Sequence, residues 1–183
     1  MSKYDNIFDA AGKGCLEDID YFVEQKDIDV DEKCKMGYTP IEYALLNENV
    51  EAIKYLVSEG AAIQPHWLIK AAGLKKGSLE IVKLFVENGI DVNYRDSGIC
   101  PLHIAASNKD IEVGKFLISK GADINSIAGS GYTPLQLAKK HGNTELVKYI
   151  SEHKRKLIPM KIVKTTLIVI GILIFLWACF ECM

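Results

Sequence analysis

The side chains that could carry out chemistry are few and scattered along this 183-residue sequence. The histidines at 66, 103, 141 and 153 and the five cysteines form no paired set with the spacing of a zinc site. The sequence has no Gly-rich phosphate loop with the Lys that should follow it, and it has no Gly-x-Ser-x-Gly nucleophile elbow. An odd number of scattered cysteines favours reduced thiols in the cytosol. The sequence therefore predicts no catalytic residue, no metal and no cofactor, and it indicates a protein that is not an enzyme.

The strongest pattern in the chain is a repeat with a period in the thirties. Cys100-Pro101-Leu102 returns as Thr133-Pro134-Leu135. Small residues that mark the first helix of each unit recur with spacings of 34, 27, 34 and 33, at Ala10, Ala44, Ala71, Ala105 and Ala138. A fixed period of this length indicates stacked supersecondary units.

Local signals divide each unit into a helix, a turn and a second helix. Thr39-Pro40 and Thr133-Pro134 are typical of a helix start, with Thr as the N-cap and Pro at the first helical position. The second helices carry apolar stripes at helical spacing, as in residues 50–57. Gly89 and Gly121 follow two of these helices and precede stretches that suit a short β-like hairpin.

These motifs resemble those of ankyrin repeats, most clearly Gly-x-Thr-Pro-Leu-x-x-Ala at 131–138 and Gly-Ala-Asp-Ile-Asn at 121–125. The resemblance implies an all-α solenoid of about five helix-turn-helix repeats with projecting hairpin fingers. It also implies that His103 ties one turn to its neighbour, and that the fingers and inner helices bind another protein. The expected units are 1–36 (a degenerate capping repeat), 37–64, 65–96 (with a shortened start and an insertion between its helices), 97–128 and 129–154.

The family's contact positions can be carried onto this chain residue by residue. At the finger tips they are Lys35, Met36, Tyr38, Asp96, Ser97, Ile99, Gly129, Ser130 and Tyr132; on the inner helices they are Leu46, Asn47, Ser107, Asn108, Lys140 and His141. Tyr38, Ile99 and Tyr132 form a periodic apolar column that either contacts a partner or packs between neighbouring fingers.

The junction between the second and third units is six or seven residues short, so we expect no full hairpin there. One interpretation is drift in a tolerant scaffold. The other is a functional notch in the finger row, lined by His66 and Trp67, and for this reason Trp67 joins the predicted contact residues. The acidic runs at 18–20 and 27–32 are interpreted as a solvated face of the first unit.

Residues 162–180 break the repeat pattern with an apolar run that would form about 28 Å of helix. A bilayer core is about 30 Å thick, so the run predicts a single transmembrane helix; the alternative is a buried capping helix. A basic linker at 155–161 precedes the run, and residues 154–164 carry five basic side chains and no acid. The positive-inside rule then places the repeats in the cytosol, as in a tail-anchored membrane protein, with lipid in contact with 154–164 and 162–180.

Charge also restricts the class of partner. Residues 1–153 carry 17 basic and 23 acidic side chains, which disfavours nucleic acid as a partner. The sequence therefore favours a membrane-anchored protein-binding scaffold or adaptor that presents its groove to the cytosol. The alternative is an inhibitor or immunity-type binder that neutralises a membrane-acting partner protein.

Overall fold

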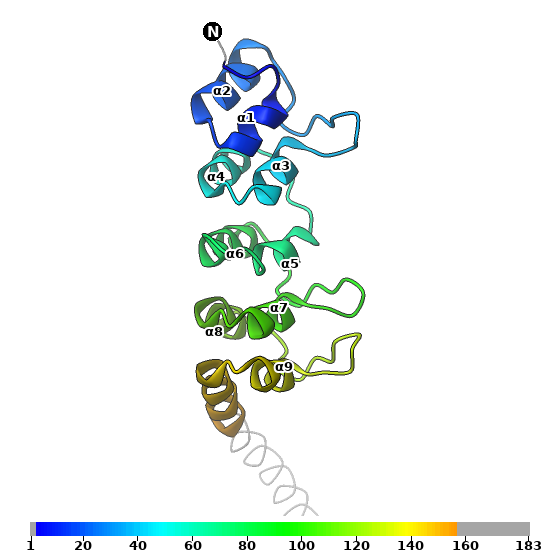
Figure 1. The fold of residues 1–183 in the computed structure, drawn as a ribbon, viewed down its shortest axis with the longest axis vertical. Coiled ribbons are helices and arrows are strands. Elements are labelled where there is room, and N and C mark those ends of the chain that lie inside the picture. Colours follow the sequence, from blue (N-terminus) through cyan, green and yellow to red (C-terminus); the bar gives the residue numbers. More distant parts are fainter. Residues whose placement is uncertain (1–2, 157–183) are drawn as a thin grey trace, which may run out of the picture.

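The chain folds into a stack of helix pairs, with the inner helices in one column and the outer helices in another (Figure 1). The structure is a computed structural model, and it describes residues 3–156. Within this range no β-strand forms, and one isolated bridge joins Asp96 to Ile99. The prediction of an all-α repeat fold is confirmed for this part of the chain.

The helix pairs follow one another along the sequence. The first is α1 (Ile7–Lys13) and α2 (Leu16–Asp20), which continues as a π-helical turn, η1 (Tyr21–Gln25). The next three are α3 (Pro40–Leu46) with α4 (Val50–Ser58), α5 (Trp67–Ala71) with α6 (Ser78–Glu87), and α7 (Pro101–Asn108) with α8 (Ile111–Ser119). The last pairs α9 (Pro134–His141) with helical residues 144–156.

Helix starts form through the capping chemistry that the sequence predicts. Thr133 Oγ1 accepts from the backbone N–H of Gln136 at 3.3 Å, and the Thr133 N–H donates to Gln136 Oε1 at 2.8 Å. At α3, the Thr39 N–H donates to Glu42 Oε2 at 2.9 Å. Each capping box satisfies N–H groups that the first helical turn leaves without partners, so α3 and α9 begin at their prolines.

The core is a continuous apolar seam between the two columns. The five small residues that mark the repeat are all fully buried. Larger apolar side chains of the outer helices fill the space beside them; they include Ile53, Leu56, Ile81, Phe85 and Leu117. Each unit therefore buries its apolar face against its neighbours, as a solenoid requires.

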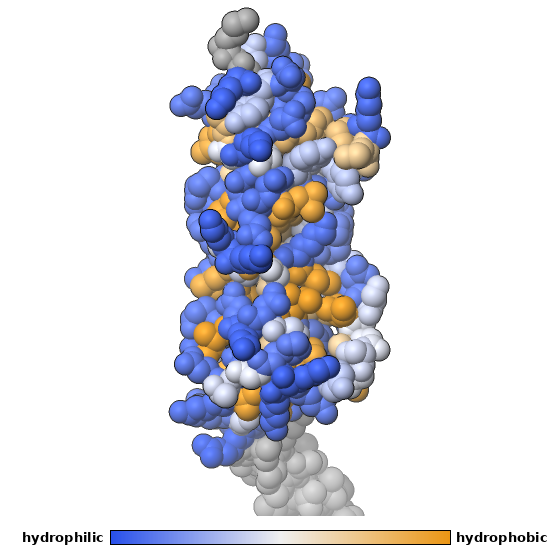
Figure 2. Space-filling view, in the orientation of Figure 1, coloured by the Kyte–Doolittle hydropathy of each residue, from blue (hydrophilic) through white to orange (hydrophobic). Residues whose placement is uncertain are grey.

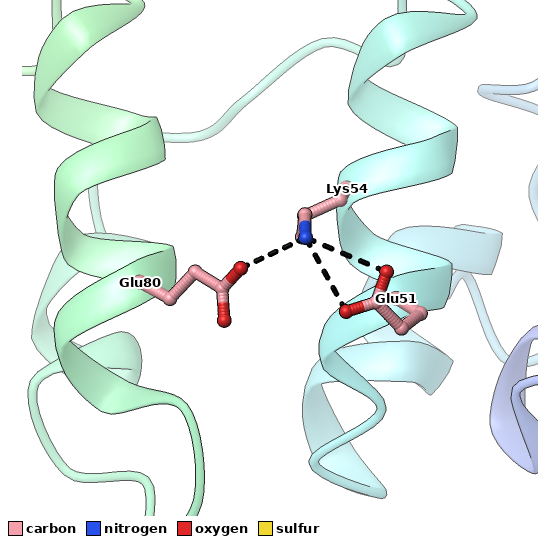
Figure 3. Close-up of polar contacts among 3 residues, drawn as sticks. All are labelled: Glu51, Lys54 and Glu80. Carbon is pink, nitrogen blue, oxygen red and sulfur yellow. Dashed lines mark hydrogen bonds and ion pairs between the residues drawn. The ribbon is translucent and has the colours of Figure 1, made fainter.

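Polar contacts between outer helices add to this seam. Tyr55 on α4 donates its hydroxyl to Asp20 at 2.5 Å. Lys54 on the same helix bonds to Glu80 on α6 at 2.8 Å and to Glu51 at 3.3 Å (Figure 3). The Lys54 pairs are exposed and contribute little to stability, because solvent screens them.

The acidic runs of the first unit do more than face solvent, which differs from their sequence interpretation. Asp18 is buried and accepts from the Cys15 thiol at 3.3 Å and from the backbone N–H of Lys3 at 3.1 Å. Asp20 receives the Tyr55 hydroxyl, and Asp31 receives the backbone N–H of Ala62 at 3.0 Å. These carboxylates hold the first unit together and tie it to the second.

Three loops project from the inner column, and we name each by the helix that it enters (Figure 1). They are the α3 finger (residues 28–39), the α7 finger (residues 90–100) and the α9 finger (residues 122–133). An aspartate opens each finger by accepting the N–H two residues later: Asp29 at 2.9 Å, Asp91 at 2.8 Å and Asp123 at 2.9 Å. These Asx turns give the fingers a common base.

The junction from Glu59 to His66 enters α5 without a comparable projection (Figure 1). After α5, a six-residue loop over 72–77 leads to α6. By comparison, two residues separate α7 from α8. The third unit therefore has a short start and a long connection between its helices.

No helix within residues 3–156 combines the length and apolar character needed to cross a bilayer. The predicted span at 162–180 lies outside the described residues, as do most of the linker at 155–161 and most of the basic segment 154–164. Residues 155 and 156 belong to the last helix.

Candidate protein-binding surface

The apolar column predicted at the fingers is exposed on all three of them. Tyr38, Ile99 and Tyr132 are 38%, 36% and 39% exposed. A backbone bond closes each finger at this residue, from Cys34 N–H to the Tyr38 carbonyl and from Ala128 N–H to the Tyr132 carbonyl, both at 2.9 Å. In the α7 finger the Asp96 N–H donates to the Ile99 carbonyl at 3.0 Å. The three side chains thus occupy equivalent positions, each with more than a third of its surface free.

The α7 and α9 fingers are fastened together. Asn93 accepts the N–H of Asp123 at 2.8 Å and donates to the Gly121 carbonyl at 3.1 Å. The Arg95 guanidinium donates to the carbonyl of Ile127 in the α9 finger. Two fingers linked in this way form a preorganised surface, which lowers the entropic cost of binding.

Glycine lets these two fingers approach each other closely. A Cβ placed on Gly129 would lie 2.8 Å from the Ser97 carbonyl oxygen, and one on Gly98 would lie 2.8 Å from the Gly129 nitrogen. Ile127 stands on the α9 finger with 58% of its surface exposed. Arg95 and Ile127 were not among the predicted contacts, because their roles depend on a neighbour about 30 residues away.

The α3 finger stands apart from the other two, because the α5 unit lacks a finger (Figure 1). Met36 is highly exposed at its tip, and Tyr38 packs edge-on against Tyr43, with ring centroids 6.1 Å apart. Partial burial raises the pKa of the Cys34 thiol, but hydrogen bonds from the backbone at Met36 and Tyr38 outweigh it and lower that pKa. The Cys34 contact and partial desolvation raise the pKa of Tyr43.

The predicted inner-helix contacts are mostly accessible. Leu46 is 57% exposed, and Asn47, Asn108, Lys140 and His141 also face solvent. Lys140 lies over the Tyr132 ring at 4.7 Å from its centroid, which joins helix α9 to its finger. Ser107 is half-buried and donates to the His103 carbonyl at 3.0 Å.

Apolar groups interrupt a mostly hydrophilic surface. Figure 2 shows them at several levels of the stack, with large ones at the levels of α5 and α7. A partner bound across this face would meet apolar groups with polar groups around them, as in many protein interfaces.

Trp67 was predicted to be a surface contact, but the structure places it in the core. Its side chain is 1% exposed and belongs to the core, because it begins α5 and packs under the short junction. Its indole Nε1 is buried and has no acceptor within the described residues. His66 remains half-buried beside it, with ring centroids 5.8 Å apart.

Cys100 and His103 form a buried polar cluster at the start of α7. His103 Nδ1 accepts the Cys100 N–H at 3.2 Å, and its Nε2 lies 3.2 Å from the Ser126 carbonyl. Nε2 therefore carries the hydrogen and donates to the α9 finger, so His103 ties one turn to its neighbour as the resemblance implies. The sequence analysis did not pair Cys100 with His103, although their spacing of three residues at a helix start could have indicated the contact, and nothing local indicates Ser126.

The thiol of this cluster is shielded from solvent. Burial raises the pKa of Cys100, but hydrogen bonds with His103 and Ser126 outweigh that effect and lower the pKa to about 7. A perturbed thiol beside histidine is a signal of nucleophilic chemistry, yet this sulfur lies under the α9 finger and faces no open site. Among residues 3–156, no group of three or more His, Cys, Asp or Glu side chains is arranged to hold a metal ion.

Comparisons with known proteins agree with the repeat geometry. Family models described as ankyrin repeats match residues 7–57 and 67–128, and a model of the single ankyrin repeat matches residues 130–155. The two boundaries between these matches fall at the short junction and in the α9 finger.

Similar proteins come from several sources. Alpha-latrocrustotoxin-Lt1a of Latrodectus tredecimguttatus is 35% identical over 131 residues, which is 67% of this chain and 9% of the toxin. Two putative ankyrin repeat proteins of Rickettsia felis are 26% and 31% identical, over 83% and 66% of this chain. The chain spans 47% and 59% of their lengths. The family models, together with the helix pairs and fingers, show that the chain belongs to the ankyrin-repeat family.

Proposed function

We propose that this chain is a scaffold that binds another protein through its finger tips and inner helices. The observation that carries the proposal is the column of Tyr38, Ile99 and Tyr132, which is exposed at equivalent positions of three fingers. Aromatic and aliphatic side chains on a rigid frame supply binding energy at low entropic cost. The family also supports protein binding as the general role.

The proposal includes that the protein catalyses no reaction. Its support is the setting of the reactive side chains. Cys100 and His103 are buried and serve to join α7 to the α9 finger. The sequence holds no phosphate loop or nucleophile elbow.

We further propose that a membrane span holds the scaffold at the cytosolic face of a bilayer. The support is the apolar run at 162–180 with the basic residues of 154–164 before it. In this arrangement the fifth unit lies nearest the membrane, and the acidic first unit lies farthest from it. No observation favours the alternative of a neutralising binder over a scaffold.

The binding surface can be tested by capture of partners on the detergent-solubilised full chain. We expect the combined change of Tyr38, Ile99 and Tyr132 to Ala to reduce recovery of the main wild-type partner at least tenfold. The matched control is Glu112→Ala, whose side chain lies on the outer helix α8. Circular dichroism should show that both variants stay folded. Full retention of the partner by the triple variant would exclude the finger column as the binding surface.

The membrane proposal has a separate test. Replacing residues 162–180 with a Gly/Ser segment should move the chain from the membrane pellet to the alkaline-extractable fraction. Replacing them with a Leu-rich span should keep both membrane attachment and partner capture. Retention in the pellet after the Gly/Ser replacement would contradict a span at this position.

A further inference from the structure

A hollow occupies the place where the α5 unit lacks its finger. It lies between the α3 finger and the short junction and has a volume of about 350 Å³. Its lining is mainly polar and includes Asp31, Lys33, Glu42, Gln64, His66 and Trp67. We call it the junction notch.

The equivalent space after the α7 finger shows what normally fills such a position. Asp31 and Lys33 occupy the register of Asn93 and Arg95, since each pair follows its Asx turn by the same number of residues. Asn93 accepts the N–H of Asp123 near the start of the following finger, and Arg95 donates to a carbonyl farther along that finger. The following finger thus fills the space beside the α7 finger.

The α3 finger retains only the first of these two contacts. Asp31 accepts the Ala62 N–H at 3.0 Å, as Asn93 accepts that of Asp123. The chain then turns directly into α5, so no carbonyl reaches Lys33. Within the described residues Lys33 makes no hydrogen bond and no ion pair. The notch therefore presents a cationic donor at the register where Arg95 holds a finger.

We propose that an extended, finger-like segment of a partner polypeptide occupies the junction notch, with a main-chain carbonyl accepting from Lys33. This inference rests on the proposed function and names part of the partner's chemistry. Asp31 and Glu42 outnumber the single lysine in the lining, so the segment carries basic side chains beside its carbonyls. A short connection alone does not require such an occupant; the unpartnered lysine in the Arg95 register argues for one.

Trp67 provides a reporter for this occupant. Its side chain lines the notch, and its indole N–H has no acceptor among residues 3–156. A buried donor without an acceptor is unfavourable, because it has lost its hydrogen bonds to water. An occupant that shifts the junction changes the surroundings of this N–H, which has its own resonance in an NMR spectrum.

The probe is a capped synthetic peptide with the sequence of residues 122–132, carrying Asp123→Lys to make it basic. It is titrated into the ¹⁵N-labelled full chain in detergent, with Trp67 assigned by comparison with Trp67→Phe. We expect a saturable shift of the Trp67 indole resonance. Lys33→Ala should weaken this binding at least fivefold, whereas the control Lys76→Ala, in the loop before α6, should leave it unchanged. No saturable shift, or equal binding by Lys33→Ala, overturns the proposal.

A second variant separates this inference from the proposed function. Gln64 stands at the register of Asn125, so inserting residues 126–131 after Gln64 supplies the missing part of a finger. This insertion should abolish peptide binding and lower partner capture at least fivefold. If partner capture survives the insertion and the wild-type chain does not bind the peptide, the notch proposal fails while the scaffold function stands. If capture is absent from the wild type but the peptide binds at Lys33, the scaffold proposal fails alone. The Trp67 resonance could instead shift as the protein concentration rises without peptide, with a doubled mass in sedimentation. That result would show that a second copy of this chain occupies the notch, and it would overturn the partner assignment.

Discussion

At the residue scale, single polar side chains join units that are neighbours in the stack. Tyr55 donates to Asp20 across the first two units. In the α7 finger, Arg95 donates to the α9 finger and Asn93 accepts from it. In a solenoid each unit contacts only its neighbours, so every such bond acts on one interface. Removing one should therefore weaken a single interface and leave the others intact.

Tyr55→Phe tests this at the first interface. The hydroxyl donates to a carboxylate, so its loss should lower the free energy of unfolding by about 1.5–3 kcal/mol at pH 8. Burial and the Asp20 hydrogen bond raise the pKa of Tyr55 above its ordinary value of 10.0. The unfolded chain then loses this proton before the folded chain does, so the advantage is full below pH 10 and falls as the pH rises above it.

Urea unfolding of wild type and Tyr55→Phe at pH 8 and pH 11 measures both effects. Tyr94→Phe is the matched control, because its hydroxyl makes no hydrogen bond within residues 3–156. A gap between wild type and Tyr55→Phe that stays constant from pH 8 to pH 11 would contradict the raised pKa.

At the scale of elements, the fingers differ in how they are supported. The α7 and α9 fingers support each other, whereas the α3 finger has no finger before or after it in direct contact. Lys35 stands in the α3 finger at the register that Gly129 holds in the α9 finger. Position 35 accommodates a side chain because no finger precedes the α3 finger. Position 129 excludes one because the Ser97 carbonyl of the α7 finger lies too close.

Gly129→Ala should therefore separate the two fingers. The added methyl would lie 2.8 Å from a backbone oxygen that cannot rotate away, and overpacking of this kind costs about 1–3 kcal/mol. Thermal unfolding should show the loss of stability, and hydrogen exchange should show faster exchange across 124–132. Ser130→Ala, one residue away on the same exposed tip, is the control and should have little effect. Equal stability of Gly129→Ala and wild type would show that the fingers are not in close contact.

At the scale of the whole molecule, we expect the third unit to be the least stable part of the stack. Its first helix, α5, has five residues, and its junction offers no finger to the neighbouring units. The Lys54–Glu80 pair spans this point between outer helices, but both side chains are exposed. The stability of a solenoid is a sum over units and interfaces, so the two ends are coupled mainly through the buried side chains of α5 and α6.

Leu68→Ala should uncouple the two ends. Leu68 is fully buried in α5, and a cavity at such a site costs about 2–5 kcal/mol. We expect urea unfolding to split into two transitions when followed by circular dichroism. Leu102→Ala, a matched change at a fully buried leucine of α7, should lower stability without this split. A single sharp transition in Leu68→Ala would show that the third unit does not limit cooperativity.

The sequence by itself determined the repeat, the helix starts at Pro40 and Pro134, and the missing finger. These features depend on capping, proline geometry and apolar spacing, which act within one or two turns of chain. The equivalence of Tyr38, Ile99 and Tyr132 also followed from the period, whereas their exposure was decided only by the structure.

Only the tertiary structure decided which side chains reach across units. It buried Trp67, directed Arg95 to Ile127 and Asp31 to Ala62, and left Lys33 without a partner in the described residues. The Arg95 and Asp31 bonds join residues about 30 positions apart in the sequence. Their meeting depends on the spacing and rotation between stacked units, and no local pattern in the chain encodes that geometry.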